Sequence, residues 1–261
     1  MYLSVCGFNH KSANLQDREP FQIPRTEVSD VVSLYKELTG CEEAAVISTC
    51  NRVEFYRVMD HRSNQYEELV DFYNHLGRKD TAILRDICYS RQGTTAARHL
   101  FRVTSGLDSL VLGEDQVIHQ VKEAYSASCA AAGPGKILHK LFHMAFQVGK
   151  RVRHETGISS GPRNIPGAAL DLLYRKRKEA PLGRAMIVGV NQLAEILLEH
   201  LTRRGVDTFL ANRTLYHAEK MAGGYDAHPV SLEEAPELLG EMDAVFTVTA
   251  CREFIIRPDD I

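Results

Sequence analysis

The sequence predicts an α/β protein in which an α+β unit is followed by a unit with a parallel sheet. Residues 2–90 carry strand and helix patterns in the order β-α-β-β-α-β, which is typical of the ferredoxin-like split unit. Beyond the Gly-, Pro- and Ser-rich stretch GISSGPRNIPG, apolar strand runs alternate with helical patterns, which favours a Rossmann-type sheet. We therefore predict an N-terminal domain over 1–156, a linker with the start of a helix over 157–180, and a Rossmann-type domain over 181–261.

The first unit opens with the alternating strand pattern YLSVCGF at residues 2–8. Thr26 is the predicted N-cap of a helix that runs to Leu38 and is closed by Gly40. The remaining elements of the unit are the strands EAAVIS and VEFYRVM, a helix near 65–76 and a strand in DICYS. This order places Cys50 in the tight connection between the second and third strands.

Helical patterns dominate residues 94–155, with Thr94 or Thr95 as the predicted first cap. Two longer helices are predicted in DQVIHQVKEAYSASCAA and KILHKLFHMAFQVGKRVRHE, joined by the loop AAAGPGK. Lys150, Arg151 and Arg153 form a candidate basic patch, although cations at a helix end also complement the helix dipole.

In the second unit, three strands are predicted in RAMIVGV, VDTFLANRT and DAVFTVTA. Helices are predicted in ALDLLYRKR, NQLAEILLEHLTRRG, LYHAEKMAGG and SLEEAPELLGEM, the second of them ended by Gly205. Strands and helices that alternate in this way form a parallel sheet with right-handed crossovers.

The composition is that of a globular protein with a real core, 44% hydrophobic and 25% charged. The net charge of −3 argues against a bulk electrostatic nucleic-acid binder, although it leaves a local basic patch open. The sequence has no apolar run long enough for a membrane span and no secretory signal pattern at its start. Six scattered cysteines without a C-x-x-C pair predict a cytoplasmic protein with no metal site.

Cys50 stands in STCNR, where every neighbour is polar, which is unusual for a packing cysteine. A catalytic cysteine needs partial exposure and nearby positive charge, and Arg52 is a candidate for that charge. The alternative is a small residue at a turn, which is the commoner role for a lone cysteine.

A second polar concentration is SGLDSLVLGEDQVIHQ, which brings Ser109, Glu114, Gln116 and Gln120 close together at the head of a helix. Gln116 and Gln120 are four residues apart and therefore share a helix face. Glu114 also suits a helix N-terminus through the dipole alone. His99 is an acid–base candidate, although a single helical histidine is more often structural.

The first turn of the second unit reads GVNQLA, Gly189 to Ala194, and has only the first glycine of the dinucleotide-binding pattern. Asn191 tolerates left-handed backbone angles, so we expect the bend to form, with its side chain beside the phosphate. Ala194 should still allow close helix–strand packing. After the next strand, Asn212, Arg213 and Thr214 favour a 2′-phosphate and hence NADP. The alternative is a Rossmann-like domain that has lost its cofactor.

Together these segments resemble the glutamyl-tRNA reductase family, which begins the C5 route to tetrapyrroles. STCNRVEFY resembles the family's nucleophile motif, and GFNHKSANLQDRE resembles its opening segment. ARHLFRVTSGLDSLVLGEDQVIHQVKEAY resembles the segment of the substrate pocket, and GKRVRHETGIS resembles the stretch that leads to the family's spinal helix. The resemblance is specific over residues 2–160 and continues more loosely to the end.

The resemblance implies a two-step reaction. The Cys50 thiolate attacks the ester carbonyl that joins glutamate to tRNA, which gives an enzyme thioester, and NADPH then supplies hydride to release glutamate-1-semialdehyde. It also implies that His99 assists the chemistry and that Arg52 clamps a substrate carboxylate. The glutamate pocket is then lined by Thr49, Asn51, Arg52, Ser109, Glu114, Asp115, Gln116 and Gln120. The cofactor residues are Gly189, Val190, Asn191, Gln192, Leu193, Ala194, Asn212, Arg213 and Thr214.

Three features depart from the family pattern. The nucleotide turn reads GVNQLA where the family has G-A-G-E-M-G or a close variant. Pro162 and Pro166 would break an early helix at the place where the family enters its spinal helix. The sequence also ends before the family's helical dimerisation domain, so it is either a fragment or a short form, and a short form would lose the usual route to a homodimer.

Three functions therefore stay open. The first is an active NADPH-dependent reductase, with glutamyl-tRNA as partner and glutamate-1-semialdehyde aminomutase as a further candidate partner. The second is a non-catalytic paralogue that binds tRNA or a pathway partner. The third is a different small-molecule NADP oxidoreductase, which would leave STCNR without a role.

Overall fold

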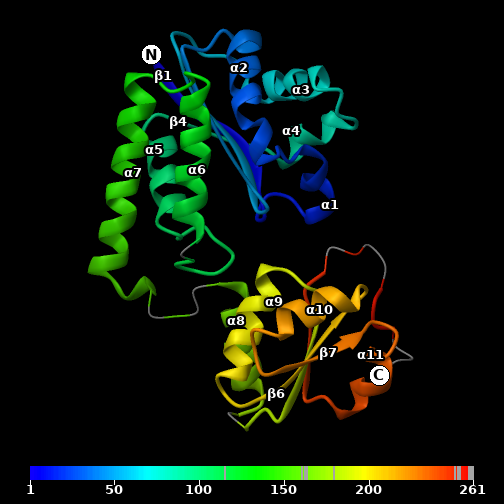
Figure 1. The fold of residues 1–261 in the computed structure, drawn as a ribbon. Coiled ribbons are helices and arrows are strands. Elements are labelled where there is room, and N and C mark those ends of the chain that lie inside the picture. Colours follow the sequence, from blue (N-terminus) through cyan, green and yellow to red (C-terminus); the bar gives the residue numbers. More distant parts are fainter. Residues whose placement is uncertain are drawn as a thin grey trace. The chain divides into compact units, whose positions relative to one another are not determined.

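The computed structural model describes residues 1–114, 116–159, 161, 164–178, 180–249, 251 and 254–257. The chain divides into two compact units, Met1–Asn164 and Ile165–Ile261, and each is described by itself (Figure 1). The boundary between the units falls inside the predicted linker, residues 157–180.

An antiparallel sheet forms the centre of the first unit. Its strands are β1 (Tyr2–Asn9), β2 (Glu43–Thr49), β3 (Arg52–Met59) and β4 (Tyr89–Gln92), in the order β2-β3-β1-β4. This order confirms the predicted ferredoxin-like unit. The last strand begins later than predicted, because residues 84–87 form the short helix α4 (Leu84–Ile87).

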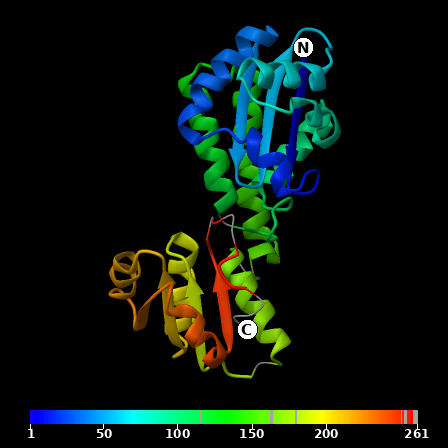
Figure 2. The ribbon, with the colours of Figure 1, turned by 90° about the vertical axis from the view of Figure 1, so that its right-hand side faces the viewer.

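Helices cover both faces of this sheet (Figures 1 and 2). One layer contains α1 (Leu15–Arg18), α2 (Val28–Thr39), α3 (Gln65–His75) and α4; the other contains α5 (Thr94–Thr104), α6 (Gln116–Ala130) and α7 (Lys136–Glu155). Because side chains alternate along a strand, each strand serves two cores. Phe8 and Phe55 pack beneath α2 and α3, whereas Val5 and Tyr56 pack beneath α5 and α7. The short 3-10 turns of the unit are Glu19–Phe21, Arg25–Glu27, Thr81–Ile83 and Gly157–Ser159.

The two threonine caps predicted for the first unit are wrong. Thr26 lies inside the 3-10 turn Arg25–Glu27, so the following helix starts at Val28 without a side-chain cap. Gly93, with a φ of 54°, is the N-cap of α5, and the Thr95 hydroxyl bonds to the backbone of Gln92 instead. The predicted closing glycine, Gly40, is confirmed by its left-handed C-cap geometry.

A parallel sheet forms the centre of the second unit. Its strands are β5 (Arg184–Val188), β6 (Asp207–Asn212), β7 (Ala227–Ser231) and β8 (Ala244–Thr247), in the order β7-β6-β5-β8. The Rossmann-type prediction is confirmed, but β7 was missed. AHPVS is short, contains a proline and buries only Val230, so its sequence has no apolar strand pattern.

The helices of the second unit also cover both faces of its sheet. α8 (Ile165–Lys176), α9 (Gln192–Thr202) and α10 (Leu215–Ala222) share one core with β5 and β6. On the other face, the long helix predicted in SLEEAPELLGEM is only α11 (Ala235–Leu238) and the 3-10 turn Leu239–Glu241. Pro166 was expected to break an early helix, but it lies in the first turn of α8, where a missing N–H costs little. Pro162 lies outside the described residues.

None of the helices in the described ranges combines the length and the hydrophobicity that crossing a bilayer needs.

Glu43 ties the sheet of the first unit to the start of α7. Its buried carboxylate accepts hydrogen bonds from the backbone N–H groups of Ile137 (3.0 Å) and Leu138 (2.7 Å). These are first-turn N–H groups that have no partner within the helix, and an anion there also complements the helix dipole.

We expect Glu43→Gln to lower the free energy of unfolding by about 1–3 kcal/mol, because a charged acceptor is lost and an NH₂ group then faces a backbone N–H. Urea denaturation followed by circular dichroism measures this change. Glu42→Gln, at the exposed neighbouring position, is the matched control and should change stability little. Equal stability of the two variants would contradict the anchoring role of Glu43.

Candidate functional site

Cys50 and Asn51 form the two-residue tip of the β2–β3 hairpin, between the paired residues Thr49 and Arg52. The Cys50 carbonyl accepts hydrogen bonds from Arg18 Nε (3.3 Å) and Gln22 Nε2 (3.2 Å). The Asn51 N–H donates to Thr49 Oγ1 (3.2 Å), and the Asn51 carbonyl accepts from the His10 N–H (2.9 Å). The backbone of the tip is therefore held from two sides, while Cys50 itself is exposed.

The charges around Cys50 differ from those expected. Burial raises the pKa of the Cys50 thiol, the Glu114 carboxylate raises it further, and Arg18 lowers it. The predicted cation was Arg52, but the cation that acts on the thiol is Arg18 from α1. Sequence reasoning missed Arg18 because it lies 32 residues away along the chain. The net effect of these groups is to raise the pKa of the Cys50 thiol.

Arg52 lies beneath the hairpin tip and is only 2% exposed. Its Nη1 donates to Glu54 Oε1 (2.6 Å), and its Nη2 donates to the Asp108 carbonyl (2.6 Å) and to Asp108 Oδ2 (3.2 Å). Both terminal nitrogens of the predicted substrate clamp are therefore bound to carboxylates of the protein. In this arrangement Arg52 connects β3 with the loop that carries Ser109.

Glu54 is the centre of this network. It is fully buried and also accepts hydrogen bonds from the hydroxyls of Tyr56 and Tyr89, both at 2.6 Å. His99 Nε2 lies 2.9 Å from Glu54 Oε1. Burial alone would raise the pKa of Glu54, but the charges of Arg52 and His99 hold it well below its usual range. Glu54 is therefore a carboxylate that is paired on both oxygens.

His99, the predicted acid–base residue, projects from α5 into the same network. Its ring is 5% exposed and packs edge-on against Tyr89, with ring centroids 5.3 Å apart. The structure thus brings His99 and Arg52 together through one shared carboxylate, Glu54. Glu54 and Tyr89 were not predicted. Arg52-x-Glu54-x-Tyr56 places three polar groups on one face of the strand, and that pattern could have revealed the network.

Asp108 extends the network to the opening segment of the chain. Lys11 Nζ donates to Asp108 Oδ1 (2.5 Å), and Asn9 Nδ2 lies 3.4 Å from Asp108 Oδ2. Burial alone would raise the pKa of Asp108, but the bond from Lys11 and the charge of Arg52 lower it. Asp108 was missed, although it is the neighbour of Ser109 in sequence.

The loop 105–114 carries the predicted pocket residues Ser109 and Glu114. Gly106 and Gly113 close it, both with positive φ, through a hydrogen bond from the Gly113 N–H to the Gly106 carbonyl (3.0 Å). Ser109 Oγ is buried without a hydrogen-bond partner among the described residues. Burial raises the pKa of Glu114, whose charge reaches Cys50. Asp115 lies outside the described residues.

Thr49 and Gln120 line one small pocket of about 160 Å³ beside the hairpin, together with Arg25 and Ser48. Gln116 is the first residue of α6 and is half-buried, one turn before Gln120. The structure therefore gathers Thr49, Cys50, Glu114 and Gln120 around the end of β2.

The nucleotide turn of the second unit differs from the expectation at Asn191. Asn191 was expected to use left-handed angles, but its backbone is extended, with a φ of −164°, and it is the N-cap of α9. Its Oδ1 accepts from the N–H groups of Leu193 (2.9 Å) and Ala194 (3.0 Å), and its Nδ2 donates to the Val248 carbonyl. The side chain thus occupies the N–H groups that a glycine-rich turn leaves for a pyrophosphate.

Other parts of the turn fit the prediction. Gly189 has a φ of 111°, and a Cβ there would come within 2.7 Å of the Thr249 side chain. Ala194 is fully buried against the sheet, so helix and strand pack closely as expected. Val190, Gln192 and Leu193 complete the turn and the start of α9.

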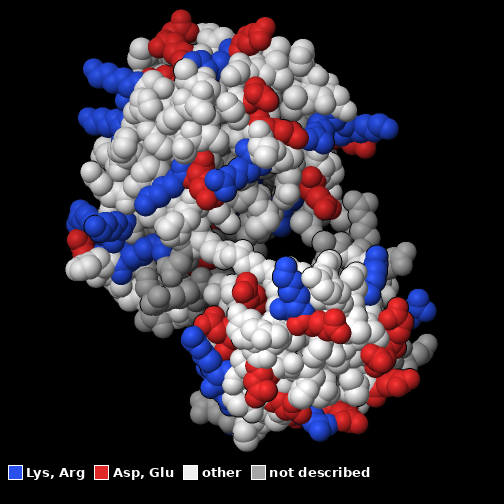
Figure 3. All heavy atoms as spheres, in the orientation of Figure 1, with Lys and Arg blue, Asp and Glu red and all other residues white. Residues whose placement is uncertain are grey.

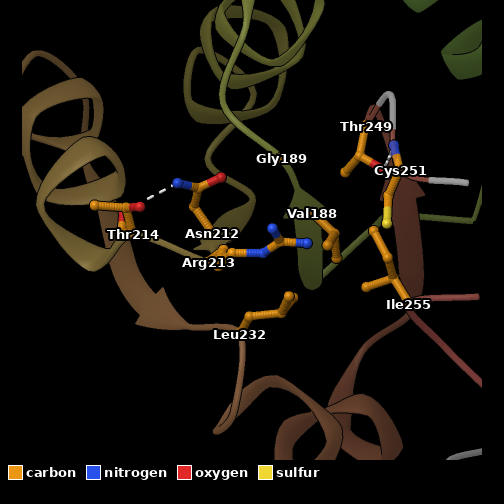
Figure 4. Close-up of a pocket in the computed structure, with 9 residues that line it drawn as sticks. All are labelled: Val188, Gly189, Asn212, Arg213, Thr214, Leu232, Thr249, Cys251 and Ile255. Atoms are coloured by element: carbon orange, nitrogen blue, oxygen red, sulfur yellow. Dashed lines mark hydrogen bonds between the residues drawn. The ribbon is translucent and has the colours of Figure 1, made fainter. Parts of the chain in front are cut away.

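A pocket of about 350 Å³ opens at the carboxyl ends of β5 and β6 (Figure 4). The Arg213 guanidinium points into it toward Val188, and Asn212 Nδ2 donates to the Thr214 carbonyl (3.0 Å). Among the described residues no carboxylate lies within ion-pair distance of Arg213. The lining residues are Val188, Gly189, Asn212, Arg213, Thr214, Leu232, Thr249, Cys251 and Ile255. An unpaired cation here fits a phosphate-bearing nucleotide.

Two family models match the chain in succession. The model of the glutamyl-tRNAGlu reductase N-terminal domain matches residues 6–156, and the model of shikimate / quinate 5-dehydrogenase matches residues 173–261. The division between them agrees with the change from the antiparallel to the parallel sheet.

Individual relatives agree with the first of these models. The chain is 38% identical over 251 residues to the glutamyl-tRNA reductase of Chromohalobacter salexigens, with 96% of this chain and 59% of the relative covered. It is 34% identical over 265 residues to that of Crocosphaera subtropica, with 100% and 62% covered. The solved glutamyl-tRNA reductase of Methanopyrus kandleri is similar with a TM-score of 0.59 and 30% identity, over 99% of this chain and 61% of that one.

The chain therefore spans about three fifths of the length of these relatives. The N-terminal model alone covers more than half of the 261 residues, and it contains the whole hairpin and the Glu54 network. On this ground the chain belongs to the glutamyl-tRNA reductase family.

Proposed function

We propose that the protein reduces glutamyl-tRNA to glutamate-1-semialdehyde with NADPH, through a thioester on Cys50, as the first step of C5-route tetrapyrrole synthesis. The observation that carries the proposal is the exposed Cys50 at a hairpin tip whose backbone is held by Arg18, Gln22 and His10, in a chain of this family. A fixed backbone beneath an exposed thiol presents the sulfur to an acyl carbon with little loss of conformational freedom.

In the first step the Cys50 sulfur forms a bond to the glutamyl carbonyl carbon, and the ester bond to the tRNA breaks. The 3′-terminal ribose oxygen leaves with a proton. The pocket with Gly189, Asn212 and Arg213 would hold NADPH, which would supply the hydride for the thioester carbonyl. Breakage of the C–S bond would then return the Cys50 thiolate. The two electrons of the reduction thus come from the cofactor, and the cysteine carries only the acyl group.

Glu114 gives the site a means of activating the thiol. A glutamyl ester carries an α-ammonium group, which a half-buried carboxylate beside Cys50 would attract. Pairing with that cation would neutralise the charge that raises the Cys50 pKa, so substrate binding would itself favour the thiolate. Ser109 Oγ, buried without a partner among the described residues, is the hydroxyl available to the substrate from the same loop.

Arg52 as the substrate clamp and His99 as the acid–base residue stay proposals, because both side chains are already bound to other groups of the protein. Arg52 can hold a substrate carboxylate only if that carboxylate replaces Asp108, which now occupies Nη2. Until then Arg52 positions the Ser109 loop against β3. His99 is held by Glu54 below the hairpin, and as the proposed acid–base residue it would act from that position. Asn51, Gln116 and Gln120 remain the proposed polar lining.

The proposed cofactor is NADPH rather than NADH, because Arg213 points into a pocket at the strand ends without a carboxylate partner among the described residues. Gly189 lines this pocket, and the Asn191 side chain would have to release the α9 N–H groups for a pyrophosphate to bind them.

The proposed location is the cytoplasm. All six cysteines are free thiols in the structure, which is compatible with a reducing compartment.

A second candidate is a non-catalytic member of the family that binds tRNA or a pathway partner. The observation that favours it is Asn191, whose side chain fills the phosphate-binding end of α9. Incubation with glutamyl-tRNA without NADPH separates the two: a glutamyl mass on Cys50 supports the reductase, and intact tRNA binding without it supports the second candidate. A small-molecule NADP oxidoreductase would leave the match over residues 6–156 without a role.

Replacement of the nucleophile is expected to abolish thioester formation. Cys50→Ser should lower the rate of semialdehyde production by roughly 10³-fold or more, because the serine hydroxyl is a far weaker nucleophile at neutral pH. Mass spectrometry of the enzyme after incubation with glutamyl-tRNA measures the acyl group. Cys251→Ser, at the other exposed cysteine, is the control and should still form the thioester. Semialdehyde made at the normal rate by Cys50→Ser would remove Cys50 from the mechanism.

The reactivity of Cys50 should depend on Glu114 and Arg18 with opposite signs. Glu114 raises the thiol pKa, so Glu114→Gln should move the midpoint of iodoacetamide alkylation of Cys50 to lower pH. Arg18 lowers the same pKa, so Arg18→Gln should move the midpoint to higher pH. Peptide mass spectrometry after timed alkylation across a pH series measures both. A shift of both variants in one direction would contradict the assigned charges.

Arg213 should determine cofactor choice. We expect Arg213→Gln to weaken NADPH binding by roughly 10- to 100-fold, because one or two charged hydrogen bonds to the 2′-phosphate would be lost. NADH binding should stay nearly unchanged. Fluorescence titration of each cofactor measures this difference. Arg204→Gln, at an exposed arginine of the same unit, is the matched control. An equal loss of affinity for NADH would show that Arg213 does not contact the 2′-phosphate.

A further inference from the structure

The outer side of α7 carries four exposed cations and one exposed acid. Lys136, Lys140, Lys150 and Arg151 are exposed along this helix. The helix has a single acidic residue, Glu155, and that residue is paired with Arg151 through two contacts of 3.0 and 3.1 Å. In Figure 3, blue side chains lie along the edge of the first unit that α7 forms. The exposed cations of α7 therefore stand in its first two turns and in its last two turns, on the side opposite the buried residues.

The neighbouring helices α5 and α6 carry further exposed cations. Arg98 and Arg102 are exposed on α5, and Lys122 on α6 lies over the Phe146 ring at 5.9 Å. The exposed acid of α6, Glu123, is paired with Arg25 at 3.0 Å. We call this surface the basic face, and its members are Arg98, Arg102, Lys122, Lys136, Lys140, Lys150 and Arg151. Among the described residues, its cations other than Arg151 have no carboxylate within ion-pair distance.

Helix dipoles do not explain the basic face. Cations near the last turn of a helix complement its dipole, which accounts for Lys150 and Arg151. Lys136, however, is the first residue of α7, and Lys140 follows one turn later, where a positive charge is unfavourable. Solubility does not explain the excess of positive charge either. The layer formed by α2, α3 and α4 mixes exposed Asp30 and Asp71 with Lys36 and Arg85.

The basic face is held rigidly. The apolar side of α7 is buried through Leu138, Leu141, Phe142 and Ala145, and Glu43 fixes its first turn. Lys136 and Lys150 are separated by 14 residues, which at the helical rise corresponds to roughly 21 Å. Arg153 does not belong to the face, because its Nη2 donates to the Glu114 carbonyl (2.8 Å). The cations are thus presented on a fixed scaffold.

We propose that the basic face docks the phosphate backbone of RNA. The inference rests on the proposed function, in which the acyl group arrives on a tRNA, and it states where that RNA lies on the first unit. Rows of lysine and arginine attract phosphates without reading sequence. A lipid surface fits less well, because the only exposed large apolar side chain in the described residues of α5, α6 and α7 is Met144. A membrane-surface helix exposes an apolar side, and that side of α7 is already in the core.

The test neutralises three cations that lie outside the catalytic site, in the variant Lys136→Gln, Lys140→Gln and Lys150→Gln. Fluorescence anisotropy then measures the Kd for an uncharged tRNA across a series of salt concentrations. We expect weaker binding at low salt and a reduction of the slope of log Kd against log salt by roughly two to three, about one for each lost phosphate contact. In turnover with glutamyl-tRNA, KM should rise while kcat stays unchanged.

A matched variant removes the same charge elsewhere on the first unit, with Arg62→Gln, Arg78→Gln and Lys79→Gln at exposed positions. It should keep the wild-type slope, and thermal unfolding of both variants checks that they are folded. An unchanged Kd and slope in the α7 variant would overturn the proposal. So would α7-dependent binding to vesicles of phosphatidylglycerol without binding to RNA.

The anisotropy measurement does not depend on thioester formation, because the tRNA carries no amino acid. The measurement can also be repeated with the Cys50→Ser variant. RNA binding that depends on α7, without any thioester on the wild-type enzyme, would contradict the proposed reductase function. It would still support the basic face as an RNA surface. A thioester on the wild-type enzyme, together with unchanged tRNA binding by the α7 variant, would support the reductase and overturn the basic face as an RNA surface.

Discussion

The buried carboxylate of Glu54 is the interaction on which the first unit's site depends. A single charged group with no exposure would be costly in a protein interior, and Glu54 is tolerated because Arg52, His99, Tyr56 and Tyr89 all bind its two oxygens. These partners come from β3, β4 and α5. Through Arg52 the network also reaches Asp108 and so holds the loop that carries Ser109 and Glu114. The hairpin that carries Cys50 therefore stands on a buried carboxylate whose two oxygens are both hydrogen-bonded.

That arrangement separates positioning from reactivity. The tip of the hairpin is held by backbone contacts from Arg18, Gln22 and His10, which fix where the sulfur is but do not ionise it. The pKa of the thiol is raised by burial and by Glu114. A raised pKa makes a thiol less prone to oxidation and alkylation, since the thiolate is the reactive form.

Much of the fold could be predicted from the sequence because its signals are local. Alternation in YLSVCGF and VEFYRVM, and the apolar stripe of Val28, Val31 and Tyr35, each depend on neighbours within a few residues. The errors fall where local signals are weak or ambiguous. AHPVS became a strand because β6 was available to pair with it, and Thr26 did not cap because the chain first made a 3-10 turn. Asn191 capped α9 rather than adopting left-handed angles, and its amide also donates to the Val248 carbonyl.

The sequence by itself determined the two-unit α/β organisation, the place of Cys50 at a tight turn, and the polar segments from Ser109 to Gln120 and from Gly189 to Thr214. Only the tertiary structure decided which groups meet. It paired Arg52 with Glu54 and Asp108, placed Arg18 and Glu114 near the thiol, and packed α5, α6 and α7 together with their exposed cations. The physical reason is that electrostatic and hydrogen-bond partners are selected by distance in space, and residues as far apart as Arg52 and Asp108 become neighbours only when the sheet and its helices have packed.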